Sequence, residues 1–357
     1  MPRRKRSLVQ NILEPPPQKL PSSLDPLPLE EEQRVEAPLR PLRLSEFIGQ
    51  RRLTENLRVY IEAARSRNNA LDHVLISGPP GLGKTTLAFI LAEELGVQLH
   101  LAHAPAIEHR GQLAALLTRL GPRDVLFIDE IHRLSSVVEE NLYTAMEDYR
   151  IDLVQGEGPM ANVIRIPLSP FTLVGATTRT GLLTGPLLSR FGIELRLDYY
   201  DPQDLCQIVL RSASILGVAI DEKAAFEIAR RSRGTPRIAN RLLRRVRDFA
   251  QVLGNGRLDL PTTRQALERL DIDEAGLDEM SRRFLRVLIE SYEGGPVGID
   301  ALAATLGEPR DTLEDVFEPY LLQSGFIART SKGRIATRKA YEHLRISPPK
   351  KSQGSLF

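Results

Sequence analysis

The fold is decided by a glycine-rich stretch, Gly78-Pro79-Pro80-Gly81-Leu82-Gly83-Lys84-Thr85. It matches G-x-x-x-x-G-K-[ST], a loop that follows a buried strand and opens a helix. The glycines let backbone N–H groups approach phosphate oxygens without a clashing Cβ, and the helix points its positive end at the same anion. Lys84 would contact the β- and γ-phosphates, and the Thr85 hydroxyl would bind Mg²⁺. The stretch therefore predicts a site for ATP and Mg²⁺.

The segments on either side of this loop alternate between helices and buried strands. Upstream, residues 51–65 carry apolar residues at helical spacing, and the run Val74-Leu75-Ile76 is typical of a short buried strand. Downstream, a helix is expected through Leu95, and the apolar runs DVLFIDE and FTLVGATT predict two more strands. This alternation predicts an α/β domain over residues 37–200, built on a parallel sheet that is covered on both faces.

Polar residues follow the second and third predicted strands. Asp129 and Glu130 come directly after the apolar residues 125–128. Asp129 would hold Mg²⁺, directly or through water, and Glu130 would orient and deprotonate the attacking water. Thr177, at the end of the third strand, would reach that water, although a threonine that caps its own turn is the alternative. His132 is compatible both with a place near the nucleotide and with a structural role.

Two arginines are candidates for contacts with the phosphates. Arg190 lies beside an aromatic residue in the stretch 186–192 and suits an arginine finger offered to the ATP of a neighbouring subunit. The residues alone leave a plain surface arginine equally open. Arg237 follows Gly234-Thr235-Pro236 at the start of a helical pattern, from which it would reach back toward the phosphates.

The remainder of the chain predicts two smaller domains. Residues 201–272 contain helical patterns that are separated by glycines, with Asp201 as the cap of the first helix, and they predict a small helical domain. Residues 273–348 contain three short helical patterns followed by a β-like pair. Three helices and a hairpin are the winged variant of the helix-turn-helix, which binds DNA.

A projecting element and two terminal segments complete the organisation. Residues 151–168 alternate between apolar and polar side chains on both sides of a turn at residues 156–159, which predicts a β-hairpin. Residues 1–36 are rich in proline and acidic side chains and predict a disordered extension. Residues 349–357 are expected to form a short tail.

Composition excludes several classes of protein. The 357 residues include a single cysteine, Cys206, so neither a disulfide framework nor a cysteine-rich zinc module is possible within one chain. The sequence shows neither an apolar run long enough to cross a membrane nor a secretory signal of the usual kind, and we expect a cytoplasmic location. The net charge is only +2, so DNA binding has to depend on local patches.

The chain contains five longer motifs: GPPGLGKT, LFIDEIHRL, GATTR, LLSRFGI and GTPRIANRLLRRVRDFA. In this order and spacing they resemble the RuvB family of AAA+ ATPases, over residues 37–348. The resemblance implies a P-loop AAA+ parallel-sheet domain, a small helical lid domain and a C-terminal winged-helix domain. It also implies a homohexameric ring on double-stranded DNA that drives branch migration of Holliday junctions with the RuvA tetramer and the RuvC resolvase. Residues 1–36 depart from the family pattern, whose members usually begin nearer Ala37.

The resemblance further implies which residues bind the nucleotide and the DNA. The implied nucleotide contacts are Leu39, Arg40, Gly81, Lys84, Thr85, Thr86, Glu147, Asp148, Tyr149, Arg190, Tyr200 and Arg237. The implied DNA contacts are Arg310, Arg329 and Arg334, and the hairpin at 151–168 is implied to dock RuvA. From the residues alone, these three arginines are also compatible with a solvated surface, and no pattern for recognising bases is evident.

Other functions of ATPases remain as alternatives at this stage. A clamp-loading AAA+ ATPase is the main one, although many of those carry a four-cysteine zinc module that this chain lacks. A transcription regulator with an ATP switch would recognise one DNA sequence. A protein unfoldase would need an aromatic loop facing a pore, for which the sequence offers no good candidate.

Overall fold

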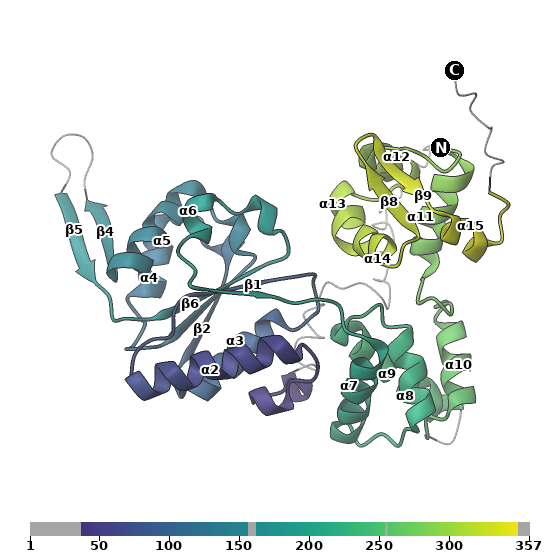
Figure 1. Ribbon diagram of the computed structural model, residues 1–357, viewed down its shortest axis with the longest axis horizontal. Helices are drawn as coiled ribbons and strands as arrows, with labels where there is room; N and C mark the ends of the chain where they lie inside the picture. Colours follow the sequence, from purple (N-terminus) through teal and green to yellow (C-terminus); the bar gives the residue numbers. More distant parts are fainter. Residues whose placement is uncertain (1–36, 156–161, 254–255, 349–357) are drawn as a thin grey trace, which may run out of the picture.

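The computed structural model describes residues 37–155, 162–253 and 256–348, which form the three parts seen in Figure 1. The predicted disordered extension, the predicted tail and the predicted turn at residues 156–159 lie outside the described residues. The predicted fold class is confirmed: a parallel-sheet domain is followed by a helical domain and a winged helix. No helix in the described ranges is long and apolar enough to cross a membrane.

The first part contains a five-stranded parallel sheet in the order β2-β3-β6-β1-β7. Its strands are β1 (Val74–Ser77), β2 (Leu99–His103), β3 (Val125–Asp129), β6 (Thr172–Thr177) and β7 (Ile193–Arg196). The three central strands are buried along nearly their whole length and were predicted from their apolar runs. The two edge strands were not predicted, because their partly exposed residues leave no apolar run.

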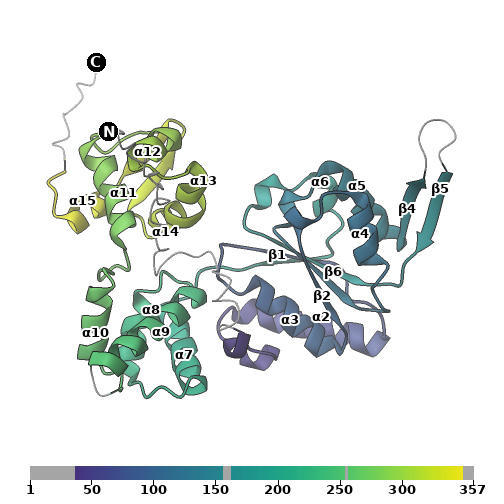
Figure 2. The ribbon, with the colours of Figure 1, turned by 180° about the vertical axis from the view of Figure 1, so that it is seen from behind.

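Helices cover both faces of this sheet. Alternate strand residues point to opposite faces, so Val74 and Phe127 pack under α2 (Arg51–Arg67) and α3 (Lys84–Leu95). Leu75 and Ile128 pack under the helices of the other face. Those are α4 (Arg110–Leu117), α5 (Ser136–Asp148) and α6 (Gly185–Leu188). The view from behind shows the same two layers (Figure 2).

A two-stranded antiparallel element projects from this domain, as Figure 1 shows. It consists of β4 (Arg150–Gln155) and β5 (Asn162–Pro167), paired in the register Ile151↔Ile166. Ile151 is buried at its base, whereas Ile164 is exposed. The alternation of the sequence thus appears in the structure as a hairpin that reaches away from the sheet.

The second part is helical and follows β7 directly. It consists of α7 (Pro202–Ile215), α8 (Glu222–Arg230), α9 (Pro236–Leu253) and α10 (Leu260–Arg269). Asp201 caps α7 as predicted, since its side chain accepts a hydrogen bond from the backbone N–H of Asp204 at 2.8 Å. The sequence predicted three helices here and missed α10 as a separate helix.

The third part has its own hydrophobic core. Its helices are α11 (Glu279–Glu290), α12 (Ile299–Leu306), α13 (Arg310–Thr312), the π-helical turn η7 (Leu313–Phe317), α14 (Glu318–Gln323) and α15 (Arg338–Leu344). The wing is the antiparallel pair β8 (Ile327–Thr330) and β9 (Gly333–Ala336). The third predicted helix is therefore continuous from α13 to α14 but contains one π-helical turn, which the sequence did not predict.

Candidate functional site

The glycine-rich loop joins β1 to α3 and forms a concave turn. Gly78 and Gly81 have φ angles of 143° and 80°, a region that favours glycine. A Cβ on Gly78 would lie 2.5 Å from the carbonyl oxygen of Leu197, and a Cβ on Gly81 would lie 2.7 Å from Cγ2 of Thr235. The loop can adopt this shape only with glycine at these two positions. Thr85 and Thr86 follow in the first turn of α3.

Lys84 lies inside this turn and is 7% exposed. Its ammonium donates hydrogen bonds to the carbonyl oxygens of Gly78 and Pro79, at 2.8 and 3.0 Å. Burial lowers the pKa of Lys84 to about 8, although the charges of Glu130 and Asp129 oppose this shift. A buried cation beside two carboxylates, in a loop of backbone amides, is suited to an anion with several oxygens.

Asp129 is the last residue of β3 and Glu130 follows it, at the end of the strand next to this loop. The Glu130 N–H donates to Oδ1 of Asp129 at 3.0 Å, and Glu130 has a left-handed backbone with φ 50°. Burial raises the pKa of Asp129, the charge of Glu130 raises it further, and Lys84 opposes both. Asp129 and the hydroxyl of Thr85 are hard oxygen donors that suit Mg²⁺. Within the described ranges no group of three or more His, Cys, Asp or Glu residues is placed to hold a metal ion.

A small polar network surrounds the Glu130 carboxylate. Thr178 donates to Oε2 of Glu130 at 3.0 Å, and Nδ1 of His132 lies 3.3 Å from the same oxygen. Thr177, the residue chosen from the sequence, lies one step away: its hydroxyl is 2.9 Å from Nδ1 of His132 and accepts the Arg179 N–H at 3.0 Å. The contact of Thr178 with Glu130 was not predicted from the sequence. Adjacent strand residues point to opposite sides, so the pair of threonines at the end of β6 was the available signal.

Several predicted nucleotide contacts from the other segments also lie around this loop. Tyr200 is buried and donates its hydroxyl hydrogen to the carbonyl oxygen of Leu82 at 3.3 Å. The Arg237 N–H donates to the carbonyl oxygen of Gly81 at 3.4 Å. The helical domain therefore contacts the loop through Arg237 at the start of α9, and the connection that leads to α7 contacts it through Tyr200.

Leu39 and Arg40 precede α2 and lie beside α3 and α7. Leu39 is buried, and its carbonyl oxygen accepts a hydrogen bond from Nη1 of Arg211 on α7 at 2.8 Å. The guanidinium of Arg40 lies 5.5 Å from the ring of Phe89 on α3. These two residues thus connect the start of the domain both to the helix that follows the loop and to the helical domain.

The remaining predicted nucleotide contacts form a second group. Arg190 pairs with Glu147 at 3.1 Å, and its guanidinium lies 4.3 Å from the ring of Tyr143. Asp148 pairs with Arg150 at 3.0 Å. Tyr149 packs against the rings of His73 and Phe171, with ring centres 6.5 and 5.9 Å apart.

The structure does not bring this second group to the phosphate loop of the same chain. His73 and Phe171 precede β1 and β6, whereas Gly78 and Thr178 follow these two strands. Arg190 likewise precedes β7, which runs parallel to β1. Strands of four residues at about 3.3 Å each separate the two edges by roughly 13 Å. The predicted nucleotide contacts therefore lie at two opposite edges of one sheet, one where the parallel strands begin and one where they end.

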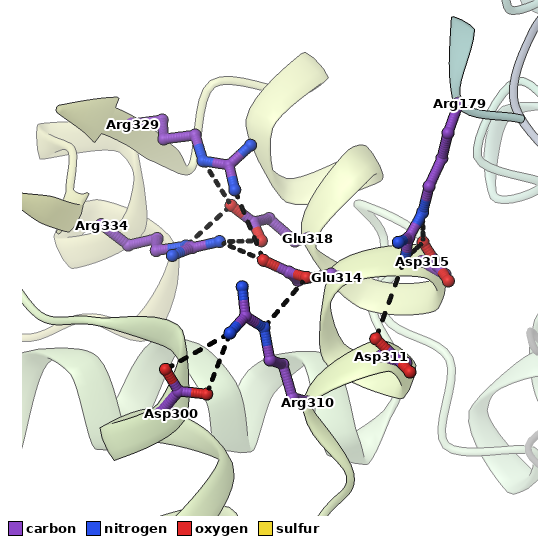
Figure 3. A network of polar contacts seen from close by, with 9 residues as sticks. All are labelled: Arg179, Asp300, Arg310, Asp311, Glu314, Asp315, Glu318, Arg329 and Arg334. Atoms are coloured by element: carbon purple, nitrogen blue, oxygen red, sulfur yellow. Dashed lines mark hydrogen bonds and ion pairs between the residues drawn. The ribbon is translucent and has the colours of Figure 1, made fainter. Parts of the chain in front are cut away.

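The three arginines predicted to contact DNA meet at η7, as Figure 3 shows. Arg310 donates to Glu314 and to Asp300, both at 3.3 Å, and Arg329 donates to Glu314 at 3.4 Å. Their side chains are 55% and 59% exposed. Both guanidinium groups are open to solvent on one face of the winged helix.

Arg334 differs from these two arginines. Its side chain is only 8% exposed and donates to Glu318 at 2.9 and 2.8 Å and to Glu314 at 3.0 Å. Glu318 is buried as well. The structure thus places Arg334 beneath the surface that Arg310 and Arg329 share, in a buried ion pair.

Comparison with protein families matches nearly all of the described chain. Residues 39–197 match the Holliday junction DNA helicase RuvB P-loop domain, residues 200–273 the RuvB AAA lid domain, and residues 274–345 the RuvB C-terminal winged helix domain. All three matches are to one family, so they favour the family resemblance over a clamp-loading ATPase.

Individual relatives agree with these matches. The chain is 57% identical to the Holliday junction branch migration complex subunit RuvB of Myxococcus xanthus, over 92% of this chain and 96% of that protein. It is 59% identical to the subunit of the same name from Rubrobacter xylanophilus, over 92% of both chains. A solved structure described as the Thermotoga maritima RuvB Holliday junction branch migration motor aligns with a TM-score of 0.81 and 52% identity, over 87% of this chain and all of that one. The chain therefore belongs to the RuvB family of AAA+ ATPases.

Proposed function

We propose that this ATPase is the subunit of a DNA motor that drives branch migration of Holliday junctions in recombination and DNA repair. The names of its relatives support the junction as substrate. One observation supports a motor made of several copies. The predicted nucleotide contacts are divided between the two opposite ends of the parallel strands.

A divided site is completed when one copy presents its second edge to the loop of the next copy. Such a head-to-tail contact uses two different surfaces, so it repeats from copy to copy, and it closes into a ring when the rotations between copies add up to one full turn. We propose a homohexamer, the number that the family resemblance implies. In this ring Arg190, with Glu147, Asp148 and Tyr149, faces the ATP that is held by the neighbour.

The residues of the first edge would bind and split ATP. The loop amides and Lys84 grip the phosphates, while Leu39, Arg40 and Tyr200 flank the nucleotide. Thr85 and Asp129 would hold Mg²⁺, which neutralises charge on the β- and γ-phosphates. Glu130 takes the proton of the attacking water, and Thr178 and His132 hold its carboxylate in place. Arg190 of the neighbour stabilises the charge of the transition state.

The helical domain would convert this chemistry into movement. Arg237 and Tyr200 bond to the carbonyl oxygens of Gly81 and Leu82, so the position of the loop is linked to the angle of the helical domain. Loss of the γ-phosphate would change these contacts, and a rigid-body rotation would follow. Because each loop faces a neighbour, one rotation displaces the next subunit along the DNA.

The winged helix would contact the duplex through Arg310 and Arg329. Both are exposed, and DNA phosphates would replace their carboxylate partners. Phosphate contacts carry no sequence information, as a motor that travels over any sequence requires. Arg334, also predicted as a DNA contact, would act from below by holding Glu314 and Glu318.

The projecting hairpin would dock the RuvA tetramer. It extends beyond the sheet domain, where a partner can reach it, and its side chain Ile164 is exposed. We propose that the RuvC resolvase acts in the same assembly, in the cytoplasm.

A branch-migration assay on a synthetic four-way junction tests this proposal. The protein with RuvA, ATP and Mg²⁺ should convert the junction to duplex products, and Lys84→Ala should not. Ile164→Asp should lose the branch migration that RuvA supports but keep ATP hydrolysis. A wild-type protein that hydrolyses ATP but leaves the junction intact under these conditions would contradict the proposal.

A further inference from the structure

One ion pair joins the sheet domain to the winged helix next to both candidate sites. Arg179 follows Thr178 at the end of β6, and its Nε donates to Oδ1 of Asp315 in η7 at 2.9 Å. Its Nη2 bonds to the same oxygen. The two residues are separated by 136 positions in the chain, and Figure 3 shows Arg179 reaching across to the winged helix.

At one end, the pair is fixed to the residues that surround Glu130. The Arg179 N–H donates to the hydroxyl of Thr177, and the preceding residue, Thr178, donates to the Glu130 carboxylate. The charge of Arg179 also lowers the pKa of His132, after the larger effect of burial, whereas Asp315 raises it. A displacement of Arg179 therefore acts on the groups that position the general base.

At the other end, the pair lies on the turn that carries the arginine partners. Glu314 precedes Asp315 and accepts hydrogen bonds from Arg310, Arg329 and Arg334. Successive helical residues point in different directions, so Glu314 faces the DNA arginines while Asp315 faces the sheet domain (Figure 3). Both belong to η7, and π-helical turns inside helices are rare and are frequently found at functional sites.

The strength of the pair suits a contact that changes during a cycle. The side chains of Arg179 and Asp315 are 34% and 42% exposed. Ion pairs that are exposed to solvent contribute little to stability. The hydrogen bond to Asp315 raises the pKa of Arg179, so the guanidinium stays charged throughout.

We propose that Arg179 and Asp315 form the contact through which DNA bound at the winged helix controls ATP hydrolysis at Glu130. Phosphates that bind Arg310 and Arg329 take these arginines from Glu314, η7 shifts, and the Asp315–Arg179 pair transmits the shift to Thr177 and Thr178. Arg179 and Asp315 are thus positioning residues. This inference rests on the proposed function, because it requires the winged helix to bind DNA.

The test is the ratio of ATP turnover with and without saturating duplex DNA. Asp315→Asn and Arg179→Gln should each bring this ratio close to one, while the affinity for duplex stays within about twofold of wild type. The charge-swapped double variant, Arg179→Asp with Asp315→Arg, should recover a ratio well above either single variant. Asp311→Asn is the matched control, because Asp311 is 83% exposed and lies 4.0 Å from Arg179; it should keep the wild-type ratio.

A second measurement does not depend on turnover. Coupling between two ligands is reciprocal, so a non-hydrolysable ATP analogue should change the duplex affinity of wild type but not of Asp315→Asn. If Asp315→Asn keeps both the wild-type ratio and this change of affinity, the inference is overturned and the proposed function stands. If duplex stimulates turnover in neither protein and neither binds it, the proposed function fails, and the inference with it.

Discussion

Lys84 shows at the scale of one residue how the loop is prepared for a phosphate. Its ammonium is buried, bonded to two carbonyl oxygens, and its pKa is lowered to about 8 by that burial. Burying this cation costs free energy in the folded state, and the charges of Glu130 and Asp129 offset that cost only in part, because the pKa is still lowered. The phosphates of ATP would supply the remaining negative charge, so part of the binding energy would come from an unfavourable feature of the free protein.

This environment predicts opposite effects of one substitution on stability and on binding. Lys84→Met removes the buried charge and keeps the length of the side chain, so the Tm of the nucleotide-free protein should be unchanged or higher. ATP at a hundred times its Kd should stabilise wild type by about 2.7 kcal/mol and should not stabilise the variant. Thermal melts with and without MgATP measure both effects. If MgATP raised the Tm of both proteins equally, the assignment of Lys84 to the phosphate site would be contradicted.

At the scale of elements, the third helix of the winged domain and the wing are held together by carboxylates. Glu314 and Glu318 lie on η7 and α14, and Arg334 of β9 pairs with both. Arg329 of β8 contacts the same carboxylates from the solvent side. Both arginines were predicted as DNA contacts, but their surroundings differ. Arg334 pairs with carboxylates in the interior of the winged helix, whereas Arg329 is exposed to solvent.

These two arginines should give different results when the charge is removed. Arg334→Gln leaves Glu318 buried without its partner, and breaking a buried pair costs about 3–5 kcal/mol, so the winged helix should unfold more easily. Arg329→Gln should change stability little but reduce the slope of log K against log salt for duplex binding by about one. Urea unfolding and salt titrations distinguish the two effects. An unchanged stability of Arg334→Gln, with the reduced slope, would instead make Arg334 a direct phosphate contact.

The whole molecule shows what a sequence can and cannot reveal. The loop at Lys84 and the carboxylates after β3 are local in sequence, and their chemistry requires fixed residue types, so both were predictable. The contact of Thr178 with Glu130 and the pair of Arg179 with Asp315 depend on how distant segments pack. No local pattern marks them, because a threonine or an arginine at a strand end is compatible with many partners.

The same limit applies to the two edges of the sheet. From the residues alone, Arg190 was equally compatible with an arginine finger and with a surface arginine. Neighbouring residues in the sequence do not determine where a side chain lies relative to a distant loop. The parallel register of β1 and β7 places Arg190 at the edge away from its own loop. This placement, together with its pair to Glu147, supports a role at the site of another copy.

A mixing experiment tests the shared site, on which the whole account depends. Arg190→Ala and Glu130→Gln should each bind ATP but hydrolyse almost none. Mixed in equal amounts, they should regain turnover, because about a quarter of the interfaces in random rings combine an intact Glu130 with an intact Arg190 from the next copy. Arg196→Ala, a change of an exposed arginine on β7, should behave as wild type. A mixture that hydrolyses no more ATP than the sum of its two components would contradict the account.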